Sequence, residues 1–193
     1  IFKLKLAGIQ KEAKMMTQAY QFKTTSVIVN GPGAAKEVGA FAKGLGKKAL
    51  IVTDSHLEEI GLLKDVRKLL ETAGVPFSIY NQVLTEPTLQ HAEDGLKAYK
   101  EAGADFLIAV GGGSPMDAAK AIGVLSTNRG KISDFMGANK IPNLSAPLLA
   151  IPTTAGTGSE VTPFTIITDT TRDVKMLIAS PHIFPRVALV DPL

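Results

Sequence analysis

Short apolar runs alternate with amphipathic stretches from about residue 21 onward. Four of these runs predict buried strands, at residues 25–29, 49–53, 76–80 and 105–110. The segments after them show capping and glycine stop signals, and they predict helices over residues 34–45, 55–73, 88–103 and 114–127. Near-continuous apolar strands joined by helices are typical of parallel sheets that carry helices on both faces. The pattern therefore predicts an α/β fold with a doubly wound parallel sheet.

The pattern changes beyond the fourth predicted helix. A loop rich in Gly, Asn and Pro leads to a short strand at 148–151, and apolar runs at 164–168 and 174–179 flank a polar turn. These two runs predict a β-hairpin that extends the α/β fold, and a last strand is expected at 186–190. We expect residues 16–193 to form a single domain.

Residues 1–15 differ from the rest because their lysines alternate with large apolar side chains. One interpretation is an amphipathic targeting or partner helix. The other, which we favour because the chain begins with Ile, is an extension added by cloning ahead of a native start at Met15 or Met16. This segment carries the net charge of +3, so the remaining chain is neutral overall and shows no basic face of the kind that binds nucleic acid.

Composition narrows the classes of function further. Of the 193 residues, 45% are hydrophobic and 20% are charged, which is ordinary for a globular protein. No stretch approaches the roughly 18 consecutive apolar residues of a membrane-spanning helix, so we expect no membrane partner. The absence of cysteine excludes disulfides, thiolate metal sites and thiol nucleophiles, and it fits a cytoplasmic location.

A turn of three glycines carries the clearest chemistry. The apolar run at 105–110 enters Gly111–Gly113, and a helix is expected to begin with Ser114 as its N-cap and Pro115 at its first position. Glycines let a phosphate approach the backbone closely, and the unpaired N–H groups of a helix N-terminus favour that phosphate. The sequence predicts phosphate binding here. The alternative is a tight turn from strand to helix that binds nothing.

An acidic residue follows the second predicted strand. Asp54 is placed to accept hydrogen bonds from an adenosine ribose diol and to repel a 2′-phosphate, which favours NAD over NADP. The alternative is that Asp54 only complements the dipole of the next helix, where Ser55 and Glu58 have the spacing of a capping box. Asp54, Glu86 and the glycine turn all follow strands, so all are expected at the carboxyl edge of the sheet, where ligands bind.

Hydroxyl side chains cluster after the strand at 148–151. They belong to Thr153, Thr154, Thr157 and Ser159, and they surround Gly156 and Gly158. A flexible backbone with short donors suits the polar edges of a nucleotide, and the alternative is a threonine-rich turn without a ligand. From residue type alone, Asp117 is expected to cap its helix, and Lys175 to be solvated.

The histidines offer no catalytic or metal-binding pattern. His56, His91 and His182 lie far apart in the sequence, show no metal-ligand spacing and are expected at the surface. Neither a Ser-His-Asp arrangement nor a GxxxxGK[ST] motif is present. The residues therefore predict a nucleotide site without obvious catalytic groups.

Two long blocks resemble the iron-containing (group III) alcohol dehydrogenase family. They are Gly111–Lys120 (GGGSPMDAAK) and Ile151–Thr162 (IPTTAGTGSEVT), and Leu50–Asp54 and Ile167–Asp169 also fit. The order and spacing of the blocks match, and the resemblance runs from about residue 20 to residue 193. It implies that this chain corresponds to the family's Rossmann-like N-terminal cofactor-binding domain, without the all-helical domain that follows it there.

The resemblance also implies roles for individual residues. In such enzymes the position of Asp54 contacts the adenosine ribose. The positions that hold the pyrophosphate match Gly112, Gly113 and Ser114, and those that line the cofactor match Thr153, Thr154, Thr157 and Thr162. The position of Lys175 approaches the nicotinamide ribose, and Glu86-Pro87 fits the family's loop after the third strand. The expected cofactor is NAD, with NADP less favoured.

The family's metal, usually Fe²⁺ and sometimes Zn²⁺, is held by one Asp and three His of the helical domain, so its ligands are expected outside this chain. The resemblance implies an enzyme that interconverts primary alcohols or diols and aldehydes by hydride transfer. This chain alone is then expected to be inactive, and a homo-oligomer is expected. Two alternatives remain: a naturally truncated nucleotide-binding module without catalysis, and a fragment of a polyol dehydrogenase acting on glycerol or propanediol.

Overall fold

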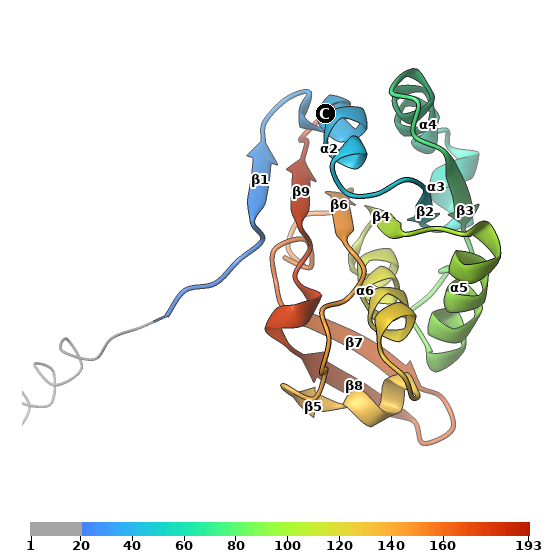
Figure 1. Ribbon diagram of the computed structural model, residues 1–193, viewed down its shortest axis with the longest axis vertical. Helices are drawn as coiled ribbons and strands as arrows, with labels where there is room; N and C mark the ends of the chain where they lie inside the picture. Colours follow the sequence, from blue (N-terminus) through green and yellow to red (C-terminus); the bar gives the residue numbers. More distant parts are fainter. Residues whose placement is uncertain (1–20) are drawn as a thin grey trace, which may run out of the picture.

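Six parallel strands form the central sheet (Figure 1). The computed structural model describes residues 21–193 and orders these strands β1-β9-β6-β4-β2-β3. Their bounds are β1 (Val27–Asn30), β2 (Ala49–Val52), β3 (Phe77–Tyr80), β4 (Phe106–Gly111), β6 (Leu148–Pro152) and β9 (Val187–Val190). Every neighbouring pair in this sheet is parallel, as expected. The predictions for residues 1–15 lie outside the described residues.

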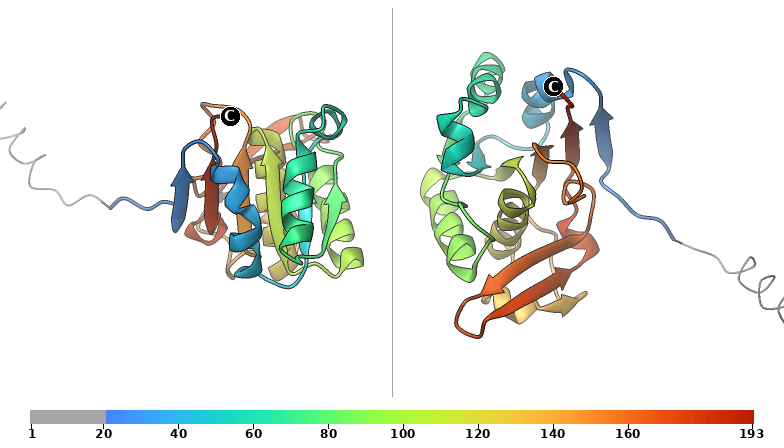
Figure 2. Two further views of the ribbon diagram at one scale, coloured as in Figure 1. Left: turned by 90° about the horizontal axis from the view of Figure 1, so that it is seen from above. Right: turned by 180° about the vertical axis from the view of Figure 1, so that it is seen from behind.

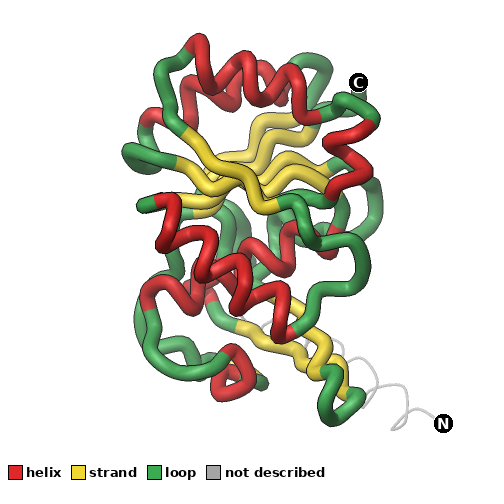
Figure 3. Tube along the Cα trace, turned by 90° about the vertical axis from the view of Figure 1, so that its right-hand side faces the viewer, coloured by secondary structure: helices red, strands yellow, loops and turns green. Residues whose placement is uncertain are grey.

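Helices cover both faces of the sheet (Figures 2 and 3). On one face lie α2 (Val38–Lys43) and α4 (Leu63–Thr72), and on the other lie α5 (Leu89–Ala102) and α6 (Gly113–Thr127). Successive side chains of a strand point to opposite faces. In β2, Ile51 packs toward α2 and α4, whereas Leu50 packs toward α5 and α6. Burial on both faces explains why this strand is an unbroken apolar run, and the doubly wound prediction is confirmed.

A smaller sheet forms a further layer outside α6 (Figure 3). It contains the antiparallel hairpin of β7 (Phe164–Asp169) and β8 (Val174–Ala179), with β5 (Gly137–Ala138) beside β8. The hairpin was predicted from its two apolar runs, whereas the short β5 was not. Ile167 and Ile178 of the hairpin pack in one cluster with Ala121 and Val124 of α6. Helix α6 is therefore covered on both sides and buried around most of its circumference.

The first and the last strand of the described chain, β1 and β9, lie side by side at one edge of the main sheet. β1 is an edge strand that pairs only with β9. Just after β9, the Asp191 carboxylate accepts hydrogen bonds from the backbone N–H groups of Gly33 (3.2 Å) and Ala35 (3.1 Å). Short 3-10 helices within residues 21–193 are η1 (Ala34–Glu37), η2 (Ile132–Phe135) and η3 (Pro181–Ile183). No helix of this described part is long and apolar enough to cross a membrane.

The single helix predicted over residues 55–73 is wrong. The segment forms α3 (Ser55–Glu59) and then α4, because Gly61 has a φ of 80° that no α-helix can continue. The expected capping box is wrong too, since Asp54 rather than Ser55 is the N-cap of α3. The predicted helix over 34–45 begins as the 3-10 turn η1 before it continues as α2.

Gly39 marks a close approach between α2 and the end of α4, and it generates a stability prediction. A Cβ at Gly39 would lie 2.8 Å from the Ala73 Cβ and 2.9 Å from the Leu69 carbonyl oxygen. Since a helix backbone cannot rotate away, Gly39→Ala should force the helices apart and lower the free energy of unfolding by about 1–3 kcal/mol. Urea denaturation measures the change.

The matched control for this prediction is Gly44→Ala. Gly44 has a φ of −84°, and the nearest atom to a Cβ there would be 3.5 Å away, so alanine fits. Equal stability of the two variants would show that the α2–α4 contact does not require glycine.

Candidate functional site

The connections that follow β2 and β4 leave the sheet in opposite directions. From β2 the chain passes through α3 and α4 on one face to β3, whereas from β4 it passes through α6 on the other face to β6. Doubly wound sheets bind ligands at the carboxyl ends of two such neighbouring strands. Asp54 follows β2 and the glycine turn follows β4. The structure therefore brings these predicted residues together at the carboxyl ends of β2 and β4, where the direction of the connections reverses. We call this place the switch point of the sheet.

The glycine turn begins α6 without a side-chain cap. Gly111 has a φ of 145°, and a Cβ there would lie 2.7 Å from the Pro115 Cγ, so the turn requires glycine. Gly112 is the N-cap and Gly113 the first helical residue, and no side chain of the described residues caps them. The prediction that Ser114 is the N-cap is wrong by two residues. Pro115 is tolerated in the first turn because an N–H there has no intrahelical partner.

The threonine-rich loop after β6 lies directly against this turn. Thr153 donates its backbone N–H to the Gly111 carbonyl oxygen at 3.0 Å. A Cβ on Gly112 would lie 3.2 Å from the Thr154 Oγ1, and one on Gly113 would lie 3.2 Å from the Thr157 Cγ2. The two sequence blocks thus form one surface, on which Thr153, Thr154 and Thr157 are exposed. Exposed hydroxyls beside uncapped backbone amides form a donor-rich edge, which suits an anion.

Asp54 has one carboxylate oxygen engaged in the fold. Its Oδ1 accepts the Leu57 N–H at 2.8 Å as the N-cap of α3. Its Oδ2 has no hydrogen-bond partner among residues 21–193. The interpretation that Asp54 complements the helix is thus correct, and the remaining oxygen is still available to a ligand.

Asp117 and Lys120 attach the hairpin to α6. Asp117 accepts the Ile166 N–H at 3.0 Å through Oδ2 and the Thr165 hydroxyl at 2.8 Å through its carbonyl oxygen. The prediction that Asp117 caps its own helix is therefore wrong: its carboxylate reaches β7, 49 residues along the chain. Lys120 is only 1% exposed, and its Nζ donates to the carbonyl oxygens of Thr162 (3.0 Å) and Phe164 (2.6 Å).

Burial favours the neutral form of both groups. It lowers the pKa of Lys120 to about 8, although the negative charges of Asp117 and Glu160 oppose this change. It also raises the pKa of the Asp117 carboxyl, and the charge of Lys120 and the Ile166 N–H oppose that shift. Sequence reasoning missed the role of Lys120. The available signal was a lysine in a helix that is otherwise apolar on nearly every side.

Lys175 and Thr162 lie on or beside the hairpin. The Lys175 ammonium contacts the Glu86 carboxylate at 2.5 Å, and both side chains are largely exposed. The loop that carries Glu86 is attached to β7, because Thr168 donates its N–H to the Pro87 carbonyl oxygen at 2.8 Å. Thr168 is also the partner of Lys175 in the hairpin register. No hydrogen bond within the described part of the chain joins Lys175 to the glycine turn.

The histidines hold local structure. The His91 ring accepts the Thr88 N–H at 3.1 Å in the capping box of α5, and burial lowers its pKa. The His182 Nδ1 lies 2.9 Å from the Ile141 carbonyl oxygen. Both are half-buried rather than fully at the surface, whereas His56 is exposed. Within residues 21–193, no group of three or more His, Cys, Asp or Glu side chains is arranged to hold a metal ion.

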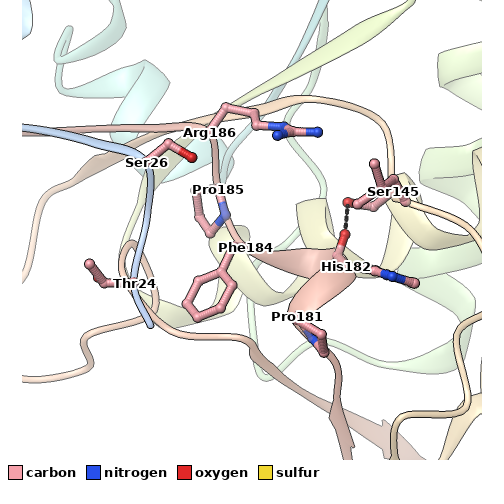
Figure 4. A pocket seen from close by; sticks show the side chains of 9 residues that line it. Thr24, Ser26, Ser145, Pro181, His182, Phe184, Pro185 and Arg186 are labelled. Atoms are coloured by element: carbon pink, nitrogen blue, oxygen red, sulfur yellow. Dashed lines mark hydrogen bonds between the residues drawn. The ribbon is translucent and has the colours of Figure 1, made fainter. Parts of the chain in front are cut away.

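A pocket of about 120 Å³ lies at the opposite edge of the sheet (Figure 4). It is lined by residues that precede β1 and β9, such as Ser26 and Arg186, and by the segment around His182. The Ser145 hydroxyl donates to the His182 carbonyl oxygen across its wall at 2.9 Å. It contains none of the predicted site residues.

Comparison with known proteins agrees with this arrangement. The profile of the family described as "Iron-containing alcohol dehydrogenase" matches residues 25–192. The chain belongs to this family. The resemblance inferred from the two sequence blocks is therefore confirmed. Among curated members, the chain is 44% identical over 165 residues to the NAD-dependent methanol dehydrogenase of Bacillus methanolicus, a match that covers 85% of this chain and 43% of that protein.

Solved structures of an oxidoreductase and a reductase share the fold. A 1,3-propanediol oxidoreductase superposes with a TM-score of 0.88 at 35% identity, covering 91% of this chain and 46% of that one. The sulfoacetaldehyde reductase of Bifidobacterium kashiwanohense, solved in complex with NAD⁺, superposes with a TM-score of 0.80 at 29% identity, covering 91% and 46%. The chain therefore spans less than half the length of the family members it matches here.

The burial of Lys120 predicts how stability depends on pH. The folded state releases the Lys120 proton near pH 8, whereas the unfolded chain keeps it to about pH 10.5, so unfolding takes up a proton between these values. The free energy of unfolding of the wild type, relative to Lys120→Met, should therefore rise by roughly 2–3 kcal/mol as the pH rises through this window. Denaturation at several pH values measures it.

The control for this pH series is Lys97→Met, which removes an exposed lysine of α5. Its stability relative to the wild type should change little with pH. A flat pH profile for Lys120→Met as well would contradict the burial of a charged group on α6.

Proposed function

We propose that this chain is the NAD-binding part of a metal-dependent alcohol dehydrogenase that transfers hydride between primary alcohols or diols and aldehydes. One observation carries the proposal: the uncapped glycine start of α6 lies at the switch point, with the threonine-rich loop packed against it. The chain spans less than half the length of its curated relatives. The hydride transfer in this proposal is therefore an activity of the whole enzyme, and NAD binding is the part assigned to this chain.

The pyrophosphate of NAD fits the glycine turn. Gly112 and Gly113 present backbone without a Cβ, and the first N–H groups of α6 have no side-chain partner within the described residues. The electropositive end of a 15-residue helix adds to the attraction. Gly112, Gly113 and Ser114 are therefore assigned to the pyrophosphate, and the exposed hydroxyls of Thr154 and Thr157 lie beside them.

Asp54 is assigned to the adenosine ribose. Its Oδ2 is available to a ribose hydroxyl, and its negative charge opposes a 2′-phosphate, so NAD is preferred to NADP. Two family members compared above support this choice, one named NAD-dependent and the other solved with NAD⁺. Thr153, Thr162 and Lys175 are assigned to the rest of the cofactor, with Lys175 directed to the nicotinamide ribose.

The chemistry of the reaction divides between cofactor and protein. When bound, the nicotinamide supplies the hydride acceptor, and this chain supplies binding and orientation. The described residues do not fit the family's metal, because they form no cluster of three or more candidate ligands. Diols are included as substrates because a 1,3-propanediol oxidoreductase superposes on this chain.

Calorimetry with the 193-residue protein tests the cofactor assignment. The wild type should bind NAD more tightly than NADP. Asp54→Asn keeps an oxygen to cap α3 but removes the charge, so the preference for NAD should shrink by about tenfold, or roughly 1.4 kcal/mol. Glu59→Gln, which neutralises an exposed carboxylate on the same helix, is the matched control and should leave the preference unchanged.

The outcomes separate two parts of the proposal. If the wild type binds neither dinucleotide, the proposed function fails. If it binds NAD but Asp54→Asn keeps the full preference, only the ribose assignment of Asp54 fails.

The metal requirement predicts that the 193-residue protein alone is inactive. With NAD, an alcohol and added Fe²⁺ or Zn²⁺, no NADH should form above the rate without protein, because the described residues provide no ligand cluster to polarise the alcohol oxygen. Absorbance at the NADH band measures this. Metal-dependent turnover by this protein would show that its own residues complete the metal site.

A further inference from the structure

The hairpin is joined to α6 by polar contacts concentrated at one place. Four hydrogen bonds link Asp117 and Lys120 to four residues of one short segment, Thr162, Phe164, Thr165 and Ile166. The rest of the α6–hairpin contact is made by apolar side chains such as Ile167, Met176 and Ile178. Apolar packing holds two layers together but specifies their register weakly, because aliphatic side chains tolerate sliding.

The polar contacts, in contrast, permit only one register. The buried Lys120 ammonium donates to the carbonyl oxygens of Thr162 and Phe164. In any other register of the hairpin it would lose these hydrogen-bond partners, which is costly for a buried charge. A slip of β7 by one residue would turn Thr165 outward and exchange buried for exposed side chains along the strand. Buried ionic groups are weak sources of stability, and fixing a register is their best-attested use.

This register places two residues assigned to the cofactor. Thr162 is held directly through its carbonyl oxygen by Lys120. Thr168, two residues beyond Ile166 on β7, pairs with Lys175 on β8, so the position of Lys175 follows from that of β7. The anchoring residues stand one and two turns along the same helix whose N-terminus is formed by Gly112 and Gly113. Helix α6 thus sets both ends of the proposed site.

We propose that Asp117 and Lys120 are positioning residues that fix the hairpin on α6 and thereby set the distance between the pyrophosphate turn and two other residues assigned to the cofactor, Thr162 and Lys175, of which Lys175 is assigned to the nicotinamide ribose. The inference rests on the proposed function. Asp117 and Lys120 do not contact the cofactor themselves in this proposal. They affect the binding of the nicotinamide half of NAD and leave the binding of the adenosine half unchanged.

Comparison of NAD with ADP isolates this effect. ADP contains the adenosine ribose and the diphosphate but not the nicotinamide half. Lys120→Met keeps an unbranched side chain that is one heavy atom shorter and removes the donors, so it should weaken NAD binding about tenfold while ADP affinity stays within about twofold of the wild type. Calorimetry of the 193-residue protein with each ligand gives both dissociation constants.

Two further variants complete the design. Thr165→Val is nearly isosteric and removes only the hydroxyl that donates to Asp117, so it should weaken NAD, and not ADP, about threefold. It carries the test if Lys120→Met does not fold. Ile178→Val deletes one buried methylene from the same hairpin without touching a polar contact. This control should leave both affinities unchanged, which separates positioning from a general loss of stability.

Each outcome bears on the inference. Selective weakening of NAD in Lys120→Met or Thr165→Val, with Ile178→Val unchanged, supports it. Equal weakening of NAD and ADP, or unchanged affinity for both, overturns it while leaving the proposed function standing. Failure of the wild type to bind either ligand overturns the proposed function and this inference together.

Discussion

The burial of α6 between two sheets is the constraint on which the rest of the structure depends. The main sheet and α5 cover one side of the helix, and the β7–β8 hairpin covers the other. Small residues permit this approach: a Cβ at Gly123 would lie 3.2 Å from the Leu107 Cδ1, and one at Gly95 of α5 would overlap the Ile122 side chain. A helix held from both sides cannot tilt, so its N-terminal amides keep a fixed direction at the carboxyl edge of the sheet.

The same helix carries a buried cation where an apolar side chain would pack more easily. Lys120 has lost nearly all contact with water, and two backbone carbonyl oxygens replace it. Desolvation opposes the charge, and the lowered pKa records that opposition. The buried Lys120 lowers the stability of the fold compared with an apolar side chain, but it fixes the position of the β7–β8 hairpin relative to the carboxyl edge of the main sheet.

The sequence was informative wherever the signal was local. Strands buried on both faces appear as unbroken apolar runs, so β2 and β4 were predicted almost to the residue. Helix starts were less predictable. Gly111 takes a positive φ, and α6 begins before Ser114. Gly61 also takes a positive φ and interrupts a helical pattern in which a single glycine is often tolerated. The partners of Asp117 and Lys120 were beyond prediction, because they lie more than 40 residues away and depend on how two layers stack. The cytoplasmic location and the homo-oligomer stay predictions.

The pairing of β1 with β9 has a consequence for the order of assembly. The two strands are separated by almost the whole described chain, and Asp191 completes the turn after β1 only from beyond β9. During synthesis β1 leaves the ribosome about 160 residues ahead of its partner, since Val27 pairs with Val187. Contacts of such large sequence separation form slowly. The backbone N–H and C=O groups of β1 therefore stay without their sheet partner until β9 has been made, which is a period of exposure to chaperones and to aggregation.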